Sequence, residues 1–397
     1  MEPQVTRVLI PDANNRAALA AVRSLGRRGC EVIAGKTGHR NLGSVSRFAR
    51  FSLMHPDPAQ DPEGFFVAVR DGVRRLGIGV VMPAADVAAN VLIERRDELP
   101  DGVRLVAPSA QSLQIAHDKV RLAAFARELS VPVPEGFEGE GDVASDPRTT
   151  ALGYPLILKP RWSRFLRDGR WANASVVEAR DADHLRALLR DRPDLSRTGF
   201  LVQAKVPGEG RGVFLLAKDG RVTCSFAHRR IREKPPWGGV STLCEAAAPE
   251  PELLGHASRL LGALKWSGVA MVEFKWDPLS KRAWLMEING RLWGSLQLAV
   301  AAGADFPWFL YQQEALGQDV SAPSPRGGVR LCWLLGDLDH FLIRLKRGGS
   351  REVRPVLRDL GRTREGRSLD LDTLKADDPL PFIAECAQRM GISGQGR

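Results

Sequence analysis

The sequence has no long apolar run and few cysteines, and both absences limit the class of protein that it can encode. No apolar stretch reaches the roughly 18 residues that a membrane-spanning helix needs. The first residues, Met1-Glu2-Pro3-Gln4, lack the basic and apolar regions of a signal peptide. The five cysteines stand singly without a Cys-x-x-Cys pair, which argues against a disulfide framework or a zinc site. We therefore expect a cytoplasmic protein without a membrane span.

Several functional motifs are also missing. No Gly-x-Gly-x-x-Gly follows the first expected strand, so dinucleotide binding is not expected there. We find no set of nucleophilic residues of the Ser-His-Asp or Cys-His kind, no helix-turn-helix signature, no aromatic RNA-binding motif and no zinc finger. The net charge is 57 − 47 = +10. Without a nucleic-acid motif, this excess is explained by an anionic small substrate or by arginine as the default polar residue, and we expect no nucleic-acid partner.

The first third of the sequence alternates between apolar strand-like segments and amphipathic helices. This alternation is typical of a doubly wound, mostly parallel α/β sheet. Since 397 residues are too many for one small core, two or three domains are expected. The expected strands are 7–10, 30–34, 80–83 and 103–107, with a helix over 64–76 among the segments between them.

The middle of the sequence has a different texture, with more strands. A helix is expected from Leu122 to Leu129, and a loop over 161–171. An Asp219-Gly220 turn predicts the pairing of 213–217 with 222–226. Other strands are expected at 154–160, 174–178 and 200–206, and other helices at 183–191, 295–302 and 307–316. Beyond residue 320 the sequence is basic and weakly patterned, and we interpret it as an appendage.

The most informative feature is a pair of strand-like runs, 272–275 and 284–291, separated by a short polar turn. If they form an antiparallel hairpin, Glu287 and Asn289 share one face and Glu273 can lie opposite them. Two carboxylates and an amide oxygen suit Mg2+, which takes one or two carboxylates and leaves its other positions to water and phosphate. The alternative is a solvent-facing charged hairpin. The apolar residues on the same runs favour the metal site, because a buried carboxylate needs a cation or a partner.

The order of these motifs resembles the ATP-grasp superfamily, specifically the branch close to carbamoyl-phosphate synthetase and the bacterial carboxylate–amine ligases. The resemblance covers roughly residues 5 to 320. It is carried by Asp118-Lys119, Ile157-Leu158-Lys159-Pro160, Leu201-Val202-Gln203-Ala204-Lys205-Val206-Pro207-Gly208, Val272-Glu273-Phe274 and Met286-Glu287-Ile288-Asn289-Gly290-Arg291. It implies an α/β chain, α+β in its central lobes, in which an N-terminal doubly wound pre-ATP-grasp domain precedes a two-lobed ATP-grasp fold. The domains implied are 1–115, a small lobe 116–200, a large lobe 201–320 with the hairpin, and the appendage 321–397.

The resemblance also implies a nucleotide site. Lys119 and Lys159 would contact ATP phosphates as compact point charges, and Lys159 and Arg291 would act in catalysis. Glu273, Glu287 and Asn289 would hold Mg2+, or Mn2+ in its place. The segment Gln203, Ala204, Lys205 and Val206 would line the adenine slot, with Glu209 among the nucleotide-binding residues.

Each of these residues also has a structural interpretation. Lys159 could be a surface lysine at a strand end, Gln203 an exposed strand residue, and Arg291 a partner of Glu287. The sequence departs from the family pattern in two places. The phosphate-covering loop is bulky and basic, and only Glu209 lies near the position of a ribose-binding acid.

A basic segment, 228–239, is expected to border the acceptor site. Arginine binds carboxylates through two parallel hydrogen bonds, so Arg230 or Arg232 could hold the substrate acid, beside Gly238 and Gly239. A solvated basic loop explains the segment equally well.

The function expected is an ATP-dependent carboxylate–amine ligase that forms an amide through an acylphosphate and releases ADP and phosphate. Its partners would be a small carboxylic acid and an amine, and the oligomer considered is a homodimer. Two alternatives stay open: a carbamoyl-phosphate-synthetase-like enzyme that uses bicarbonate or carbamate, and a non-catalytic nucleotide-binding relative. The absence of an amidotransferase domain counts against the first, and the intact carboxylates and Lys159 count against the second.

Overall fold

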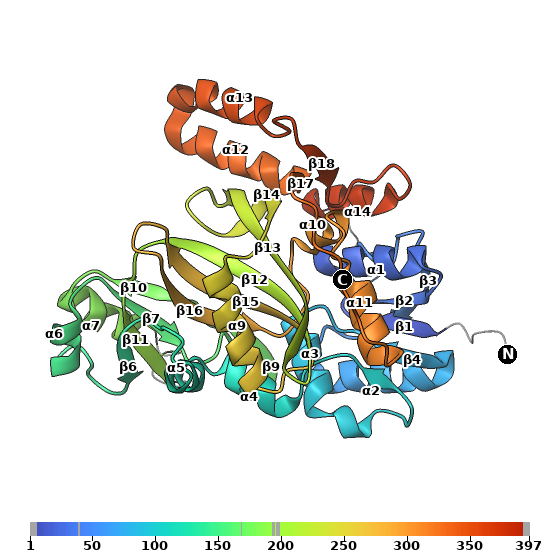
Figure 1. Cartoon of the computed structure of the whole chain (residues 1–397), viewed down its shortest axis with the longest axis horizontal. Coiled ribbons are helices and arrows are strands. Elements are labelled where there is room, and N and C mark those ends of the chain that lie inside the picture. The colour runs from blue at the N-terminus through green and yellow to red at the C-terminus, as the bar shows by residue number, and fades with distance from the viewer. Residues whose placement is uncertain (1–5, 39, 168, 193–194, 196–198, 392–397) are drawn as a thin grey trace.

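The computed structural model describes residues 6–38, 40–167, 169–192, 195 and 199–391. An N-terminal domain, a small antiparallel lobe and a large sheet follow one another along the chain, and two helices project from the large sheet at the C-terminal end (Figure 1). The predicted fold class is confirmed. No helix of the described residues is long and apolar enough to cross a membrane.

The N-terminal domain is a five-stranded parallel sheet with the order β3-β2-β1-β4-β5. Its strands are β1 (Arg7–Ile10), β2 (Glu31–Lys36), β3 (Ala49–Met54), β4 (Ile78–Val81) and β5 (Arg104–Leu105). Its helices are α1 (Arg16–Arg27), α2 (Pro62–Leu76), α3 (Asp86–Glu94) and α4 (Ala110–His117), with a 3-10 turn η1 (Arg96–Glu98). Helix α1 begins where Asn15 accepts a hydrogen bond from the amide of Ala18, which satisfies one of its free N–H groups.

The small lobe is an antiparallel sheet with the order β10-β7-β11-β6. Its strands are β6 (Gly136–Gly139), β7 (Leu156–Pro160), β10 (Val177–Ala179) and β11 (Phe200–Ala204), and its helices are α5 (Lys119–Glu128), α6 (Pro147–Leu152) and α7 (Ala182–Asp191). A separate two-stranded hairpin, β8 (Arg164–Arg167) and β9 (Arg170–Asn173), stands where the sequence predicted a loop. Because β11 belongs to the small sheet, the predicted boundary between residues 200 and 201 falls inside a strand.

The large sheet has seven strands in the order β16-β15-β12-β13-β14-β17-β18. They are β12 (Glu209–Lys218), β13 (Arg221–Lys234), β14 (Val240–Ala247), β15 (Gly268–Asp277), β16 (Arg282–Asn289), β17 (Val329–Cys332) and β18 (Ser368–Leu371). Its helices are α9 (Pro251–Ala263), α10 (Leu296–Ala301), α11 (Phe306–Leu310) and the π-turn η2 (Tyr311–Ala315). The predicted pairing through Asp219-Gly220 is confirmed as β12 and β13.

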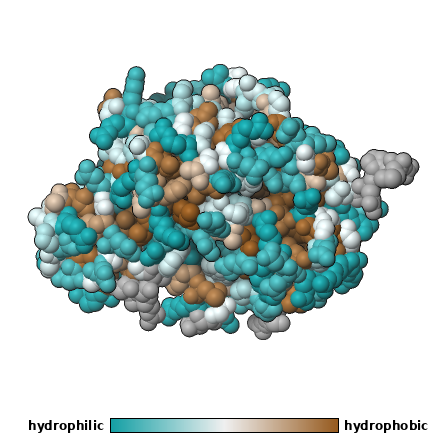
Figure 2. Space-filling model, turned by 60° about the horizontal axis from the view of Figure 1, so that its bottom comes forward, coloured by the Kyte–Doolittle hydropathy of each residue, from teal (hydrophilic) through white to brown (hydrophobic). Residues whose placement is uncertain are grey.

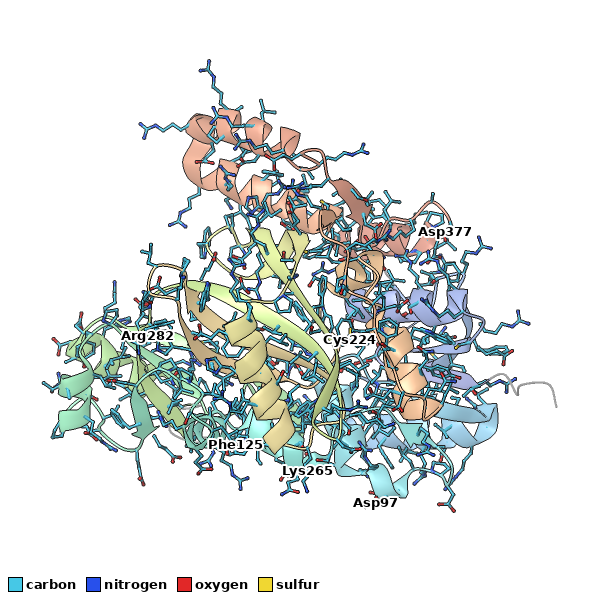
Figure 3. All side chains as sticks on the ribbon, viewed as in Figure 1. Asp97, Phe125, Cys224, Lys265, Arg282 and Asp377 are labelled. Atoms are coloured by element: carbon cyan, nitrogen blue, oxygen red, sulfur yellow. The ribbon has the colours of Figure 1, made fainter. Side chains whose placement is uncertain are left out.

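The C-terminal residues differ from the appendage expected. Strand β17 pairs with β14, and β18 pairs with β17, so both extend the large sheet. The remaining elements are α12 (Leu334–Gly348), η3 (Gly349–Glu352), α13 (Val353–Gly361) and α14 (Leu380–Arg389). Long side chains that end in nitrogen project from α12 and α13, and the loop before α14 carries Asp377 (Figure 3). The basic residues that suggested an appendage therefore lie mostly on the surface of this segment, whereas its strands belong to the large sheet.

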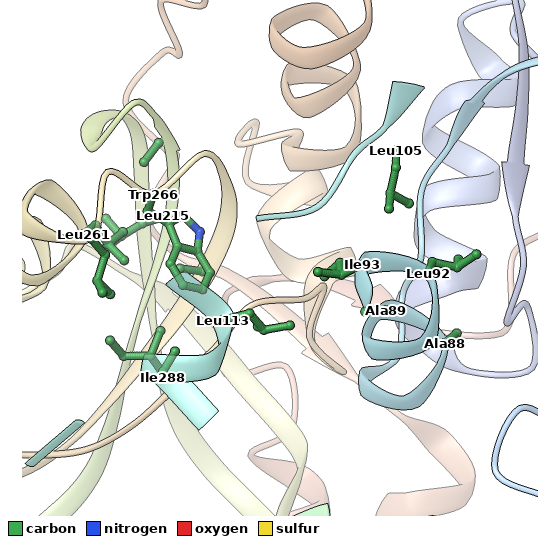
Figure 4. Packing of buried hydrophobic residues seen from close by; sticks show 14 of the residues in the cluster. Ala88, Ala89, Leu92, Ile93, Leu105, Leu113, Leu215, Leu261, Trp266 and Ile288 are labelled. Carbon is green, nitrogen blue, oxygen red and sulfur yellow. The ribbon is translucent and has the colours of Figure 1, made fainter. Parts of the chain in front are cut away.

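One apolar core joins the N-terminal domain to the large sheet. It runs from α3, through Leu92 and Ile93, past Leu113 of α4 to Trp266 and Ile288 (Figure 4). All five are buried. The face shown in Figure 2 is mostly hydrophilic, with apolar patches between the charged side chains. Because the core is continuous, the N-terminal domain is fixed against the end of β16, where the candidate site lies.

Candidate active site

The predicted carboxylate hairpin is formed by β15 and β16, which pair antiparallel with Glu273 directly opposite Glu287. The amide nitrogen of Asn289 donates to Glu287 at 2.9 Å and lies 3.5 Å from Glu273. The register shifts between Glu273 and Phe274, where Met286 is the extra residue on β16. Such a bulge bends the strand and redirects side chains. Here it falls directly beside the opposed pair of Glu273 and Glu287, which share one face.

The two carboxylates carry more negative charge than their surroundings balance. Burial, followed by the negative charge of Glu287, raises the pKa of Glu273 above its ordinary range. The nearest cation to Glu273 is Arg230, at 3.7 Å. No three His, Cys, Asp or Glu side chains of the described residues come together as a metal site. The donor set is thus two carboxylates and the side chain of Asn289. This set fits an Mg2+ ion whose other positions are taken by phosphate and water. The Asn289 amide could present its oxygen to the ion after a flip.

Two lysines lie beside this pair, of which Lys119 is buried and Lys159 half-buried. Lys119 donates to Ser163 Oγ at 2.6 Å, and Lys159 Nζ lies 3.4 Å from the sulfur of Met286. Burial lowers the pKa of both ammonium groups, that of Lys159 to about 8, while the charge of Glu287 acts in the opposite direction. Within the part of the chain that the structure describes, neither lysine forms an ion pair. A buried cation of this kind is stabilised when an anion enters.

Arg291 is held by the N-terminal domain. Its Nε donates to Asp86 at 2.9 Å, so its partner is Asp86 and not Glu287. Arg291 lies close enough to the carboxylates for its positive charge to lower the pKa of Glu273. The sequence analysis missed Asp86, although its place at the start of α3, just beyond the carboxyl end of β4, is where ligands bind in parallel sheets. It also missed His117 and Ser163, for which the sequence offered no signal.

The residues expected around adenine divide into two groups. Gln203 is buried, lines a small cavity with Lys119, Lys159 and Met286, and its side-chain oxygen has no hydrogen-bond partner among the described residues. Ala204 and Val206 are half-buried at the end of β11. Lys205 is exposed and pairs with Glu178 at 2.8 Å.

The last residue of the expected nucleotide set also faces outward. Glu209 is exposed and pairs with Arg211. Among the expected residues of this set, Gln203 and the two lysines are the ones that meet at one cavity.

The basic segment expected at the acceptor site is largely the end of strand β13, rather than a loop. Arg232 is buried and donates to both oxygens of Asp337, at 2.7 and 2.6 Å, and to Thr363. Its guanidinium is thus used inside the C-terminal part of the fold, which corrects its expected role in holding the substrate. Arg230 contacts Glu233 at 3.2 Å and Glu273 at 3.7 Å, so it borders the hairpin.

The two glycines of this segment are exposed in the turn after β13. Gly238 and Gly239 have φ angles of 132° and 156°, a region that favours glycine. Beside them the Arg347 guanidinium lies 4.7 Å from the Trp237 ring. The turn is therefore packed against α12.

A cavity of about 690 Å³, hereafter the main cavity, opens next to the hairpin. Helices α3, α4 and α5 form one side, the end of β16 forms another, and the β8–β9 hairpin covers it. The residues that line it are Asp86, Asn90, Ile93, Glu94, Ala110, Leu113, Gln114, Ala116, His117, Asp118, Lys119, Arg121, Trp162, Ser163, Arg164, Phe165, Leu166, Arg167, Trp171, Glu287, Ile288 and Asn289. Two of the candidate metal residues, Glu287 and Asn289, thus meet Lys119 and the β8–β9 hairpin at one cavity, whereas Glu273 is not among its lining residues.

The β8–β9 hairpin is fastened at both ends. The amide of Trp171 donates to the carbonyl of Ala59 at 2.8 Å, and the amide of Lys119 donates to the carbonyl of Arg161 at 3.0 Å. Arg161 also pairs with Asp118 at 2.8 Å. The hairpin is therefore held over the cavity by contacts to the N-terminal domain and to α5.

Comparison with known proteins agrees with this geometry. Residues 196–335 match the family model described as "ATP-grasp in the biosynthetic pathway with Ter operon". The chain is 24% identical over 209 residues to the carbamoyl phosphate synthase arginine-specific large chain of Bacillus subtilis (strain 168), which covers 51% of this chain and 20% of that protein. It is 27% identical over 222 residues to D-alanine–D-alanine ligase of Chromohalobacter salexigens, which covers 52% of this chain and 66% of that protein.

Among solved structures, the complex of biotin carboxylase from Campylobacter jejuni with β-γ-ATP superposes with a TM-score of 0.63 at 16% identity. The match covers 82% of this chain and 74% of that chain. At this identity the likeness shows the fold alone. The family model matched by residues 196–335 agrees with the resemblance to the ATP-grasp superfamily. The chain spans a fifth of the length of the first of its two sequence relatives and about two thirds of the second.

Proposed function

We propose that this chain, which has the ATP-grasp fold, is an ATP-dependent ligase that joins a carboxylic acid to an amine through an acylphosphate. The observation that carries the proposal is the meeting of Glu273, Glu287 and Asn289 with the buried Lys119 and the half-buried Lys159, which form no ion pair within the described residues. Metal-binding oxygens and unpaired cations at one place suit a polyphosphate whose terminal charge must be offset. The likeness to D-alanine–D-alanine ligase supports amide formation.

The acidic residues would bind the metal ion, and the basic residues would bind the phosphates. Glu273, Glu287 and Asn289 would hold Mg2+, which when bound offsets the charge on the β- and γ-phosphate oxygens. Lys119 and Lys159 would contact the phosphates as point charges, and their burial strengthens each contact because little water screens it. Gln203 would face the base through the small cavity. Asp86 would position Arg291 for the transferred phosphoryl group.

The reaction proposed proceeds in two balanced steps. A carboxylate oxygen of the substrate attacks the γ-phosphorus, the bond from that phosphorus to the β–γ bridging oxygen breaks, and ADP leaves. The amine nitrogen then attacks the acyl carbon, phosphate leaves with the bonding electrons, and the nitrogen gives up one proton. Water competes for the acylphosphate, so the cover formed by the β8–β9 hairpin would favour the amine by excluding solvent.

An isotope experiment tests this reaction. A substrate labelled with 18O in its carboxylate should deliver one labelled oxygen to the released phosphate, and the nucleotide product should be ADP. Release of AMP and pyrophosphate would overturn the acylphosphate route and leave ATP binding intact. Labelled bicarbonate in place of the acid tests the carbamoyl-phosphate-synthetase-like alternative, and MgATP binding without ADP release from any acid would identify a non-catalytic relative.

A further inference from the structure

The main cavity is longer than a phosphate and a metal ion require. Helix α3 lines it with Asp86, Asn90, Ile93 and Glu94, which share one face because they are spaced by four, three and one residues. Asp86 lies at the inner end, where it pairs with Arg291. Glu94 is eight residues further along, which corresponds to about 12 Å at 1.5 Å per residue. The cavity therefore extends well away from the carboxylate hairpin.

Helix α4 runs along the same cavity in the opposite sense. It contributes Ala110, Leu113, Gln114 and His117, again from one face. His117 directly precedes Asp118 and Lys119, so it marks the inner end, and Ala110 lies about 10 Å further out. Since both helices line the cavity over their length, the space is elongated. Its volume of about 690 Å³ lies in the range of small-molecule sites.

The chemistry of the walls changes along this length. Leu113 is a buried apolar residue in the middle of α4, and Ile93, also buried, is the last residue but one of α3, next to Glu94. The side-chain amides of Asn90 and Gln114 lie in the middle of the two helices, and each offers a donor and an acceptor. Amide groups next to apolar surface match the alternation of peptide bonds and side chains.

The two ends of the cavity carry different charges. Lys119 and, two residues later, Arg121 stand at the inner end. The acidic residues at this end are Asp86, which pairs with Arg291, Asp118, which pairs with Arg161, and Glu287. Lys119 forms no ion pair within the described residues, so it is the group that favours an anion. Arg164 and Arg167 of the covering hairpin add positive charge along the wall. The outer end of the α3 face terminates in the exposed carboxylate of Glu94. A substrate with a carboxylate at one end and an ammonium group at the other matches this order.

We infer that the main cavity binds a peptide-like carboxylic acid two to three residues long, with its carboxylate at Lys119 and its free amino end at Glu94. An extended chain spans at most 3.3–3.6 Å per residue, so about 12 Å holds three residues, or two beside a phosphoryl group. Asn90 and Gln114 would bind its peptide groups. The inference rests on the proposed function, because the carboxylate placed at the inner end is the one that would be activated.

The test uses L-leucine, dileucine, trileucine and N-acetyl-trileucine as probes, with binding measured by calorimetry on the full chain without nucleotide. We expect dileucine or trileucine to bind at least tenfold more tightly than leucine, and N-acetylation to weaken binding about tenfold. Gln114→Trp should block the cavity from an exposed position on α4. Gln111→Trp, on the same helix but outside the lining, is the matched control and should bind normally.

A second pair of variants tests the amino end. Glu94→Gln should remove the preference for free trileucine over N-acetyl-trileucine, whereas Asp97→Asn, exposed nearby and outside the lining, should keep it. The inference is overturned if leucine binds as well as the peptides, or if Gln114→Trp and Gln111→Trp behave alike. Peptide binding without ADP release from any acid would instead refute the proposed ligase and leave the peptide site standing. ADP release from single amino acids that the cavity variants do not change would refute the peptide site and leave the proposed ligase standing.

Discussion

Glu273 and Glu287 face each other across two strands, with Arg230 at 3.7 Å as the nearest cation. Such a pair is unfavourable unless a cation joins it, because two like charges at short distance in a buried place repel each other. Burial and, after it, the negative charge of Glu287 raise the pKa of Glu273. Two carboxylates that served only the fold would not be expected to face each other at this distance.

Glu287→Gln should separate metal binding from stability. Without divalent ions the variant should melt at the same or a higher temperature than the native chain, because the repulsion is gone. With Mg2+ and ATP its ADP release should fall about 100-fold or more, since charge stabilisation in the transition state is lost. Thermal melts in EDTA and a coupled ADP assay measure both. Glu209→Gln, exposed and paired with Arg211, is the control, and near-normal ADP release by the Glu287 variant would refute the metal assignment.

The lowered pKa of Lys159 predicts that MgATP binding depends on pH. In the free protein the charged lysine is disfavoured, so this group makes folding more favourable as the pH rises from about 8 towards its ordinary value of 10.5. A bound phosphate reverses the preference and raises the pKa. Binding should therefore take up protons above pH 8, and affinity should fall by up to about tenfold per pH unit there.

Calorimetry in two buffers of different ionisation enthalpy measures this proton uptake. Lys159→Met should reduce the uptake, leaving the part due to Lys119, whose pKa is also lowered by burial. Lys205→Met should leave it unchanged, since that lysine is exposed and paired with Glu178. An affinity that stays constant between pH 7.5 and 9.5 would contradict the placement of phosphate at Lys159.

At the scale of elements, the β8–β9 hairpin stands where the sequence predicted a loop over 161–171. Its cross-strand pairs include Phe165 with Ala172 and Leu166 with Trp171. Trp171 is half-buried and packs against the core that joins the N-terminal domain to the large sheet. A bulky hairpin tied to that domain can cover the cavity more permanently than a loop of small residues, because apolar contacts hold it down.

Trp171→Ala should loosen this cover. Loss of a half-buried indole should cost about 1–3 kcal/mol of unfolding free energy, below the 3–5 kcal/mol typical of a fully buried aromatic residue. Water should then reach the acylphosphate, so the ratio of ADP to amide product should rise. Denaturant unfolding and product analysis measure the two effects. Trp162→Ala, at the more exposed base of the hairpin, should change the ratio less, and an unchanged ratio in Trp171→Ala would show that the hairpin does not exclude water.

An element could be predicted when its own residues carried a clear pattern of apolar and polar side chains. The β15–β16 hairpin was predictable because apolar residues alternate with Glu273, Glu287 and Asn289, and the turn between them is polar. Strand β3 was missed because it is an edge strand with mostly exposed side chains, so the sequence lacks the apolar run expected of a strand in a parallel sheet. The β8–β9 hairpin was missed because its arginines are typical of a loop.

Side-chain partners were less predictable than strands. Arg230 and Arg232 are chemically identical and two residues apart, so regular strand alternation would put them on the same face. The register of β13 shifts between them, and this bulge separates their directions. Only the distant Asp337, which no local pattern connects to β13, explains why one is buried and the other borders the site. The same holds for Arg291, whose partner Asp86 is 205 residues away.

At the scale of the whole molecule, the last residues return to the first helix. Arg23 of α1 is buried and donates to Asp378 at 2.8 Å and to the carbonyls of Asp372 and Thr373. Arg16, about two helical turns earlier, pairs with Asp372 at 2.6 Å. These contacts join the N-terminal domain to the segment interpreted from sequence as an appendage. A homodimer stays a prediction.

Arg23→Met should be among the most destabilising single changes in the chain. Removing one partner of a buried ion pair leaves the other uncompensated, which typically costs 3–5 kcal/mol. Arg27→Met is the matched control on the same helix, because its pair with Asp377 is half exposed and worth about 1 kcal/mol or less. Denaturant midpoints of the two variants measure the difference, and equal midpoints would show that the buried pair is not needed for stability.

A chain that ends after residue 320 tests the same point for the whole segment. If 321–397 were an appendage, its removal would leave the rest folded. In the structure its loss would expose the edge of β14, where β17 now pairs, and leave Arg16 and Arg23 without their carboxylates. An unpaired sheet edge promotes association with other chains, and a buried arginine without a partner is strongly unfavourable. We therefore expect the shortened chain to aggregate or to be digested rapidly by protease, whereas a shortened chain that melts cooperatively at the native temperature would support the appendage interpretation.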